Sequence, residues 1–223
     1  MDGAQYGEAH PDWYAYDTDA VISDPTKAGY TFLGWLVNGE STARKDLTLR
    51  KEAYLDNITL TATWEQNPYK ITWNVNEGDK LTGEGYTVEA FYGNPITAPS
   101  DPTRRGYTFG GWYTDGSNFA ENTKFKTGDK MPEGDVTYYA KWTAIEYTIT
   151  YNLDGGTNVS GNPAQYTVET GKITLLDPTK TGYRFDGWYT DDTYSTKVTE
   201  IAADSTGGVT LWAKWTVNQY TIT

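Results

Sequence analysis

The chain has 223 residues, of which 37% are hydrophobic and 15% aromatic, so it has enough apolar side chains to build cores. It contains no Cys and a single His, His10, which excludes disulfides, thiol nucleophiles, Cys-type zinc sites and a Ser-His relay outside the extreme N-terminus. The formal net charge of −12 disfavours binding to phosphate backbones, so nucleic acid is not an expected partner.

The start of the chain, MDGAQYGEAH, lacks the basic and apolar regions of an export signal. No apolar run approaches the roughly 18 residues that a membrane span needs. We therefore expect no direct insertion into a membrane, and these residues carry no signal for localisation.

Three copies of one segment recur along the chain, 77 and 76 residues apart. Each copy begins with D-P-T-x-x-G-Y, continues into F-x-G-W and later closes on a strand-like segment that ends in Trp. The copies begin at Asp24, Asp101 and Asp177 and close on Trp64, Trp142 and Trp215. Four residues separate each closing Trp from a new opening segment: YKITW at 69, YTITY at 147 and YTIT at 220.

A period of about 75 residues is too long for a solenoid unit and lies near the lower limit for a self-sufficient domain. We therefore expect separate domains arranged as beads, and the short connectors predict a semi-rigid rod. The predicted segments are repeat one at 1–66, repeat two at 67–144, repeat three at 145–216 and the start of a truncated fourth repeat at 217–223.

Repeat one departs from the others at its beginning. Only 23 residues precede Asp24, whereas 30 or more separate the opening Tyr from the corresponding Asp in the other repeats. The first strand of repeat one is therefore predicted to be missing or heavily altered. Unpaired strand edges invite pairing between chains, so self-association through the end strands is expected.

Within repeat three, alternation of apolar and polar residues predicts a strand from Tyr147 to Leu153, which ends in a turn at 153–156. A second strand is expected at 165–170, a turn at Asp177–Pro178 and a third strand over YRFDGWYT. Lys197–Asp204 is the only plausible helical turn of this repeat, and Val209–Trp215 alternates again as the closing strand. The expectation is a small antiparallel or mixed sheet with at most one short helix.

The F-x-G-W segments could be a sugar-binding platform, but we favour a core role because a small domain without disulfides needs buried aromatics. Phe185 and Trp188 would face opposite sides of a regular strand, and a bulge at Gly187 would bring both to the core. The predicted core aromatics are Phe32, Trp35, Trp64, Phe109, Trp112, Trp142, Phe185, Trp188 and Trp215.

Trp212 lies on the opposite face of its closing strand from Val209, Leu211, Ala213 and Trp215, and repeat two has Tyr139 in the matching place. Such an aromatic could contact a ligand or simply a neighbouring strand, and the second reading is favoured. The candidate partner-contact residues are Tyr113, Tyr139, Tyr189 and Trp212.

Other chemistry has weak support. Asp191 and Asp192 could offer oxygen ligands to calcium, but without an EF-hand loop a solvated turn is the better interpretation, so no metal site is predicted. No motif selects a nucleotide site or a catalytic pair of carboxylates, so neither a cofactor nor enzyme activity is expected. A Lys–Asn isopeptide crosslink through Lys141 or Lys214 is disfavoured because both lie opposite the predicted core face.

The order I-T-Y-N-x-x-G-G, D-P-T-K-x-G-Y-x-F-x-G-W-Y-T-D and V-T-L-W-A-K-W resembles the Listeria and Bacteroides repeat, also called the internalin B-type B repeat. The likeness covers repeats two and three almost completely and repeat one from about Asp24 to Trp64. It implies α+β, strand-dominated tandem β-grasp domains similar to ubiquitin and SUMO, on secreted or wall-attached bacterial surface proteins.

The sequence therefore predicts a non-enzymatic stalk or adhesion region at the bacterial cell surface or cell wall. Its expected partner is a protein or glycan at the cell surface. A carbohydrate-binding module that uses exposed aromatics is the alternative, and a hydrolase fragment is a weaker one.

Overall fold

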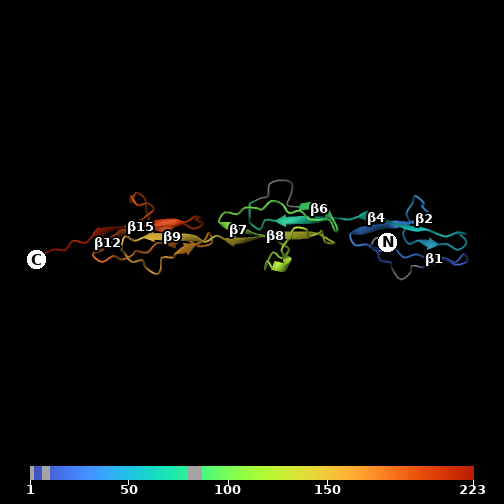
Figure 1. Ribbon diagram of the computed structural model, residues 1–223, viewed down its shortest axis with the longest axis horizontal. Coiled ribbons are helices and arrows are strands. Elements are labelled where there is room, and N and C mark those ends of the chain that lie inside the picture. The colour runs from blue at the N-terminus through green and yellow to red at the C-terminus, as the bar shows by residue number, and fades with distance from the viewer. Residues whose placement is uncertain (1–2, 7–10, 80–86) are drawn as a thin grey trace. The chain divides into compact units, whose positions relative to one another are not determined.

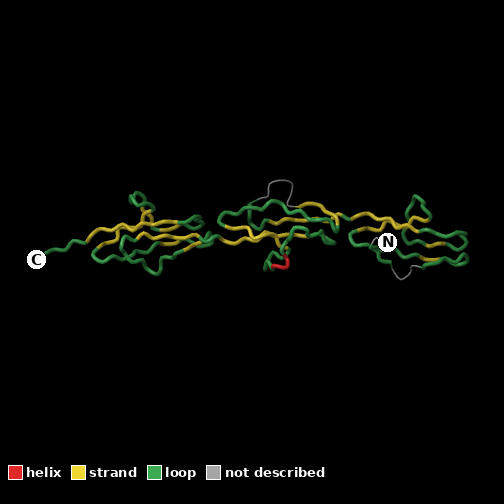
Figure 2. The backbone as a smooth tube through the Cα atoms, in the orientation of Figure 1, coloured by secondary structure: helices red, strands yellow, loops and turns green. Residues whose placement is uncertain are grey.

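The structure is a computed structural model that describes residues 3–6, 11–79 and 87–223. Strands form nearly all of its regular secondary structure, as Figure 2 shows. Among the described residues the one helical element is the 3₁₀ turn η1, Glu121–Thr123. This agrees with a sequence rich in Tyr, Trp and Thr, which favour the pleated surface of a sheet.

Backbone contacts group the chain into two compact units. The first unit comprises residues 1–76, 80–100 and 111–140, and the second comprises 77–79, 101–110 and 141–223. We keep the names repeat one, two and three for the predicted segments, whose boundaries stay predictions.

Repeat one, in the first unit, has two pairs of strands (Figure 1). The short strands β1 (Ala20–Val21) and β3 (Thr48–Leu49) pair antiparallel, as do the longer β2 (Tyr30–Val37) and β4 (Leu60–Gln66). Their core cluster consists of Ile22, Phe32, Trp35, Val37, Leu47 and Leu49. Within the described residues, neither β2 nor β4 has a further strand on its outer side.

Repeat two contains a four-stranded sheet in the order β6 (Thr87–Phe91), β5 (Pro68–Asn74), β8 (Val136–Ala144) and β7 (Tyr107–Tyr113). The opening strand β5 pairs antiparallel with β6 and parallel with the closing strand β8. The sheet is therefore mixed, with the first and last strands of the repeat side by side.

Repeat three, in the second unit, has a five-stranded sheet in the order β10 (Gln165–Tyr166), β9 (Tyr147–Asn152), β15 (Val209–Val217), β12 (Tyr183–Tyr189) and β13 (Lys197–Val198). Its opening strand β9 again runs parallel to its closing strand β15. A separate pair, β11 (Ile173–Thr174) with β14 (Glu200–Ile201), covers part of the same core.

The bulge predicted at Gly187 is present. Two residues of β12, Asp186 and Gly187, lie opposite the single residue Lys214 of β15. Gly187 has a φ of +141°, and the same shift in register occurs at Gly34 of β2. The extra residue rephases the strand, so the rings of Phe185 and Trp188 meet at 5.4 Å.

Two local predictions in repeat three were wrong. The expected helical turn at Lys197–Asp204 is absent. Val198 belongs to β13 and pairs with Trp188 of β12, and Ile201 belongs to β14 and pairs with Ile173 of β11. The apolar spacing of three also suits two short strands separated by one residue. The strand expected at 165–170 ends at Tyr166, because Thr167 and Thr170 bond to each other in a turn.

Candidate functional sites: the repeat joints and an outer aromatic face

Each D-P-T-x-x-G-Y segment forms the same tight turn. The Tyr N–H donates to the carbonyl three residues earlier at 3.0–3.1 Å, and the basic side chain at that earlier position lies over the Tyr ring at 4.0–4.3 Å. The three pairs are Lys27 with Tyr30, Arg104 with Tyr107, and Lys180 with Tyr183. The glycine in each turn has a φ of +76° to +80°, a conformation that side chains rarely adopt.

The turn glycines also hold the connectors between repeats. The third residue after each closing Trp donates its N–H to the carbonyl of the turn glycine of the same repeat, at 2.9 Å in every case. These bonds join Asn67 to Gly29, Ile145 to Gly106, and Asn218 to Gly182. The connector therefore leaves each repeat along a fixed path, which explains why its length is constant.

In the first unit, Gly29 is the contact point with repeat two. A Cβ atom at Gly29 would lie 2.3 Å from Cβ of Tyr92, so only glycine allows this approach. The Gly29 N–H also points to a carboxylate oxygen of Glu133 at 3.4 Å. The turn of repeat one thus receives two side chains of the next repeat.

In the second unit, Gly106 makes the equivalent contact with repeat three. A Cβ atom there would lie 2.0 Å from Cγ1 of Val168. Arg105 donates to the hydroxyl of Thr206 at 3.2 Å, and the hydroxyl of Tyr107 donates to Glu169 at 3.0 Å. Partial desolvation and this bond to Glu169 raise the pKa of Tyr107.

The two joints use matching positions of the following repeat. Tyr69 pairs with Ala90 and Tyr147 with Tyr166, so Tyr92 and Val168 each lie two residues beyond the partner of an opening Tyr. Glu133 and Thr206 likewise each lie three residues before the first residue of a closing strand, which is Val136 in β8 and Val209 in β15. The third turn differs, because a Cβ at Gly182 would have no described atom within 4 Å.

An aromatic cluster lies on the outer face of the repeat three sheet. Tyr189 and Trp212 are direct cross-strand partners, and the Tyr189 ring meets that of Tyr194 edge-on at 5.5 Å. The Lys214 ammonium lies 5.3 Å from the Tyr189 ring and 5.5 Å from the Tyr194 ring. Tyr189 and Trp212 are half-buried, so each offers part of its ring to a partner.

Repeat two has a matching aromatic pair, but there the Tyr is buried. Tyr113 meets Phe119 edge-on at 5.6 Å and pairs with Lys124 of the following loop, and its exposed fraction is 2%. Burial therefore argues against Tyr113 as a contact residue, whereas a contact role for Tyr139, Tyr189 and Trp212 stays a prediction. The signal in the sequence was the longer spacing from Trp112 to Trp142, which supplies the covering loop.

The model of the Listeria-Bacteroides repeat domain family matches three segments of the sequence, residues 6–63, 69–141 and 147–214. The chain belongs to this family. Each matched segment contains one of the D-P-T-x-x-G-Y turns described above and most of a closing strand.

Curated relatives contain similar repeats. Two proteins of Evansella cellulosilytica, whose names describe a membrane protein and a Gly-rich membrane protein, are each 34% identical over 91% and 93% of this chain. Internalin H of Listeria monocytogenes is 39% identical over 55% of it. The chain spans less than a third of each relative, 29%, 23% and 22% respectively.

A solved structure of two tandem SHIRT domains from a streptococcal cell surface protein is also similar. It covers 67% of this chain and 98% of its own, with 18% identity and a TM-score of 0.27.

The aromatics predicted for the core of each Listeria-Bacteroides repeat differ in burial. Phe32, Trp35, Trp112 and Trp188 are buried. The other five are half-buried: Trp64, Phe109, Trp142, Phe185 and Trp215. Trp64, Phe185 and Trp215 pack against a core cluster, and the rings of Phe109 and Trp142 lie against each other at 5.5 Å. A first-strand aromatic adds to the packing in repeat three, where Tyr151 meets Trp188 at 5.2 Å, and in repeat two, where Trp73 meets Trp112 at 5.1 Å.

Asp191 uses its carboxylate within its own turn. It accepts bonds from the N–H and hydroxyl groups of Thr193 and Ser195 and from the N–H of Thr196. These bonds, led by that from the Thr193 hydroxyl, hold the pKa of Asp191 well below its usual range. In the part of the chain that the structure describes, no group of three or more His, Cys, Asp or Glu residues could hold a metal ion.

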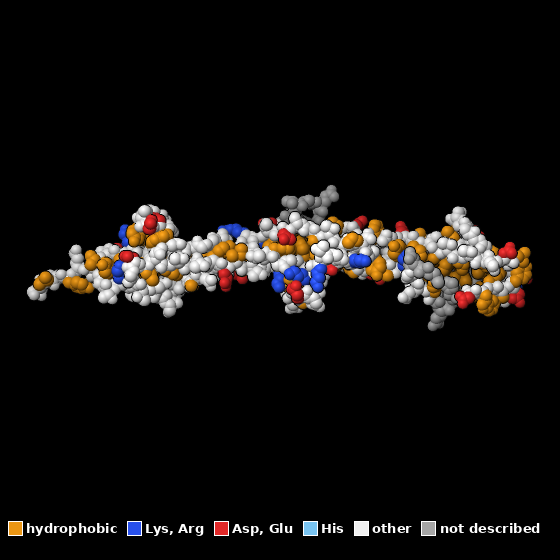
Figure 3. Space-filling model, in the orientation of Figure 1, with side chains coloured by type: hydrophobic (Ala, Val, Ile, Leu, Met, Phe, Trp, Pro, Cys, Tyr) orange, Lys and Arg blue, Asp and Glu red, His pale blue; other side chains and the backbone are white. Residues whose placement is uncertain are grey.

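Acidic side chains are scattered over the visible face of the molecule rather than gathered in one patch (Figure 3). Among the described residues, no helix is long and apolar enough to cross a membrane.

Proposed function

We propose that these repeats form a stalk-like spacer of a bacterial cell-surface protein, which carries other parts of the protein away from the surface. The spacer role is non-enzymatic, and the location is extracellular. Membership of the Listeria-Bacteroides repeat family supports this, because the family resemblance implies tandem arrays on secreted or wall-attached proteins. Longer relatives in which such repeats are only a part also support it.

One observation carries the proposal. In every repeat, the connector is bonded to the turn glycine of the repeat that it leaves, and two of these glycines receive a side chain of the next repeat. A spacer needs such defined connections, because a flexible connector would let the repeats fold back on one another. An independent binding module has no need of them.

Small-angle X-ray scattering tests the proposal on the whole chain. The maximum dimension should increase by a constant amount as repeats are added, from repeats two and three to the complete chain. A dimension that stays the same, or a scattering curve typical of freely jointed domains, would contradict the spacer role.

We further propose that each complete repeat is a β-grasp domain. The order in repeat three, with the second strand, first strand, last strand and third strand adjacent in turn and the first and last parallel, supports this. Backbone assignments by NMR would test it, since the parallel pair gives characteristic contacts between residues such as Ile149 and Val209.

A second candidate function is carbohydrate binding at the outer aromatic face. The arrangement of Tyr189, Tyr194 and Trp212 around Lys214 supports it, because half-exposed rings can stack on sugars. A glycan panel read by Trp fluorescence is the test. Binding that Trp212→Ala abolishes while the melting temperature is nearly unchanged would support this function, and no response to any glycan would argue against it.

A further inference from the structure

Beside the D-P-T-x-x-G-Y turn, repeats one and three each have a pocket of similar size. Its volume is about 590 Å³ in repeat one and about 530 Å³ in repeat three. Both linings contain the Pro, Thr, basic residue and Tyr of the turn, the Phe of the bulged strand and the closing Trp. Equivalent residues thus form the same hollow in both repeats, and we call it the turn pocket.

A short backbone bridge holds one side of each turn pocket. Thr157 and Thr179 exchange two backbone hydrogen bonds, at 2.7 and 3.0 Å. Gln5 and Thr26 do the same at 2.8 and 2.9 Å. Thr26 and Thr179 are the Thr residues of the two turns, so Gln5 and Thr157 occupy equivalent places. The pocket is therefore a feature of the repeat rather than of one copy.

Aromatic rings form another side of the pocket in repeat three. Trp215 meets Phe185 at 5.3 Å, and its Nε1–H donates to the carbonyl of Leu153 at 2.9 Å. A Cβ atom at Gly156 would lie 2.6 Å from Cζ2 of this indole, so the backbone packs closely against it. Since its N–H is used within the repeat, Trp215 offers ring carbons rather than a donor to a ligand.

The charges around the turn pocket are balanced. The Lys180 ammonium lies over the Tyr183 ring at 4.3 Å and donates to the carboxylate of Asp154 at 3.1 Å. In repeat one, two basic and two acidic residues line the pocket: Lys27, Lys45, Asp24 and Glu133. A charged ligand gains little from such a lining, so the pocket favours a neutral one.

Hydroxyl groups complete the lining in repeat three. Within the described part of the chain, the hydroxyls of Thr179, Thr181 and Tyr183 have no hydrogen-bond partner. Each can therefore both donate to a ligand and accept from it. Repeat two differs, because Thr103, the counterpart of Thr179, donates its hydroxyl to the carboxylate of Asp79 at 2.5 Å.

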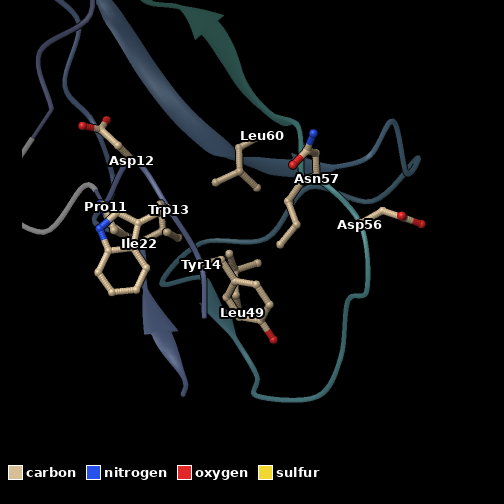
Figure 4. Close-up of a pocket in the computed structure, with 10 residues that line it drawn as sticks. Pro11, Asp12, Trp13, Tyr14, Ile22, Leu49, Asp56, Asn57 and Leu60 are labelled. Atoms are coloured by element: carbon tan, nitrogen blue, oxygen red, sulfur yellow. The ribbon is translucent and has the colours of Figure 1, made fainter. Parts of the chain in front are cut away.

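A pocket of about 360 Å³ in repeat one is separate from the turn pocket. Figure 4 shows Tyr14, Leu49 and Leu60 facing one another across it, while Asp56 points away. It shares no lining residue with the turn pocket. Trp13 also lines it and is 76% exposed, so this residue can be changed as a control without altering the turn pocket.

Ring surfaces beside hydroxyls, without net charge, match the chemistry of a sugar. The C–H groups of a sugar pack on aromatic rings, and its hydroxyls exchange hydrogen bonds with Thr and Tyr. Both volumes lie within the range of about 300–1,000 Å³ that is typical of small-ligand sites. A Pro-rich peptide also packs on rings, but it presents carbonyl acceptors, and the Trp215 N–H that could serve them is bonded inside the repeat.

We propose that the turn pockets of repeats one and three each bind one unit of a neutral saccharide. In repeat three the sugar packs on Tyr183 and Trp215, and its hydroxyls bond to Thr179 and Thr181. Glu133, which lines the pocket of repeat one, belongs to repeat two, so a sugar bound there also touches the following repeat. The site is distinct from the outer aromatic face, and the inference does not depend on the spacer role.

NMR titration of the complete chain tests the binding. The probes are three neutral sugars, N-acetylchitotetraose, cellotetraose and maltotetraose, and the peptide decaproline. At least one sugar, at up to about 10 mM, should shift the amide signals of Thr26 and Thr179, and that of Thr103 should shift less. No shift with any of the three sugars, or a shift with decaproline alone, would overturn the proposal.

Substitutions test the contacts. Thr179→Val removes one hydroxyl at nearly constant volume, so it should weaken binding in repeat three about tenfold and leave binding in repeat one unchanged. Thr26→Val should have the reverse effect. Trp13→Ala, in the separate pocket, and Trp212→Ala, on the outer aromatic face, are controls that should change neither. Unaltered binding in both Val variants, or a loss caused only by one of the controls, would contradict the proposed site.

Discussion

Gly106 and Gly182 occupy the same turn, have the same φ of +80° and accept the same connector bond, yet their surroundings differ. A side chain at Gly106 would collide with Val168, whereas one at Gly182 would meet no described atom within 4 Å. Glycine can therefore be required at this position for two different reasons. The turn requires its conformation in every repeat, and only a joint with a following repeat requires the absence of Cβ.

Trp188→Ala should have the largest effect on stability, because it removes a side chain from the interior of a repeat rather than from a joint. Trp188 is 2% exposed and meets the rings of Phe185 and Tyr151, so its loss should lower the free energy of unfolding of repeat three by about 3–5 kcal/mol. Denaturant unfolding measures this. Trp212→Ala, on the outer face, is the control and should have a clearly smaller effect.

Gly106→Ala against Gly182→Ala tests the comparison directly. Both substitutions force alanine into a left-handed conformation, which costs about 1–2 kcal/mol. Gly106→Ala should cost about 1–3 kcal/mol more, because the added methyl group overpacks the contact with Val168. Thermal unfolding of the two variants gives the difference, and equal losses would mean that the joint does not hold in solution.

Val168→Ala should rescue part of that difference. The atoms nearest the added methyl group are the two γ-carbons and Cβ of Val168, and the substitution removes the γ-carbons. In a double-mutant cycle, Gly106→Ala and Val168→Ala should show a favourable coupling of about 0.5–2 kcal/mol. The pair Gly182→Ala and Val168→Ala should be additive.

The smallest effect concerns the Tyr107–Glu169 bond of the joint. The pKa of Tyr107 is raised in the folded chain, so its contribution to stability is present below the ordinary value of 10 and is lost as pH rises through the folded value. Glu169→Gln should lower the pKa of Tyr107 in an ultraviolet titration, because it removes the acceptor charge. An unchanged titration would place Glu169 away from Tyr107.

The bulge and the strand pattern could be predicted from sequence because they depend on local spacing. Phe185 and Trp188 can share a face only if the strand is rephased, and Gly187 marks where that occurs. The prediction of a helical turn at 197–204 was wrong because apolar residues three apart fit a helix and two short strands equally well. The burial of Tyr113 was missed because a loop that follows it in the sequence covers its ring.

The role of the turn glycines in the joints was also missed, although their recurrence was visible. The contacts that require Gly29 and Gly106 come from Tyr92 and Val168, which lie 63 and 62 residues later. The residues next to each glycine in the sequence therefore do not predict this contact. The constant four-residue connector was the available signal, since a flexible link has no reason to keep its length.

The parallel pairing of opening and closing strands has a mechanical consequence. Tension on a repeat enters through its first strand and leaves through its last, and in repeat three these are the neighbours β9 and β15. Pulling them in opposite directions loads all of their mutual hydrogen bonds at once in shear, instead of peeling them apart one by one. Repeat two has the same arrangement in β5 and β8, so a force along the chain would load its first and last strands in the same way.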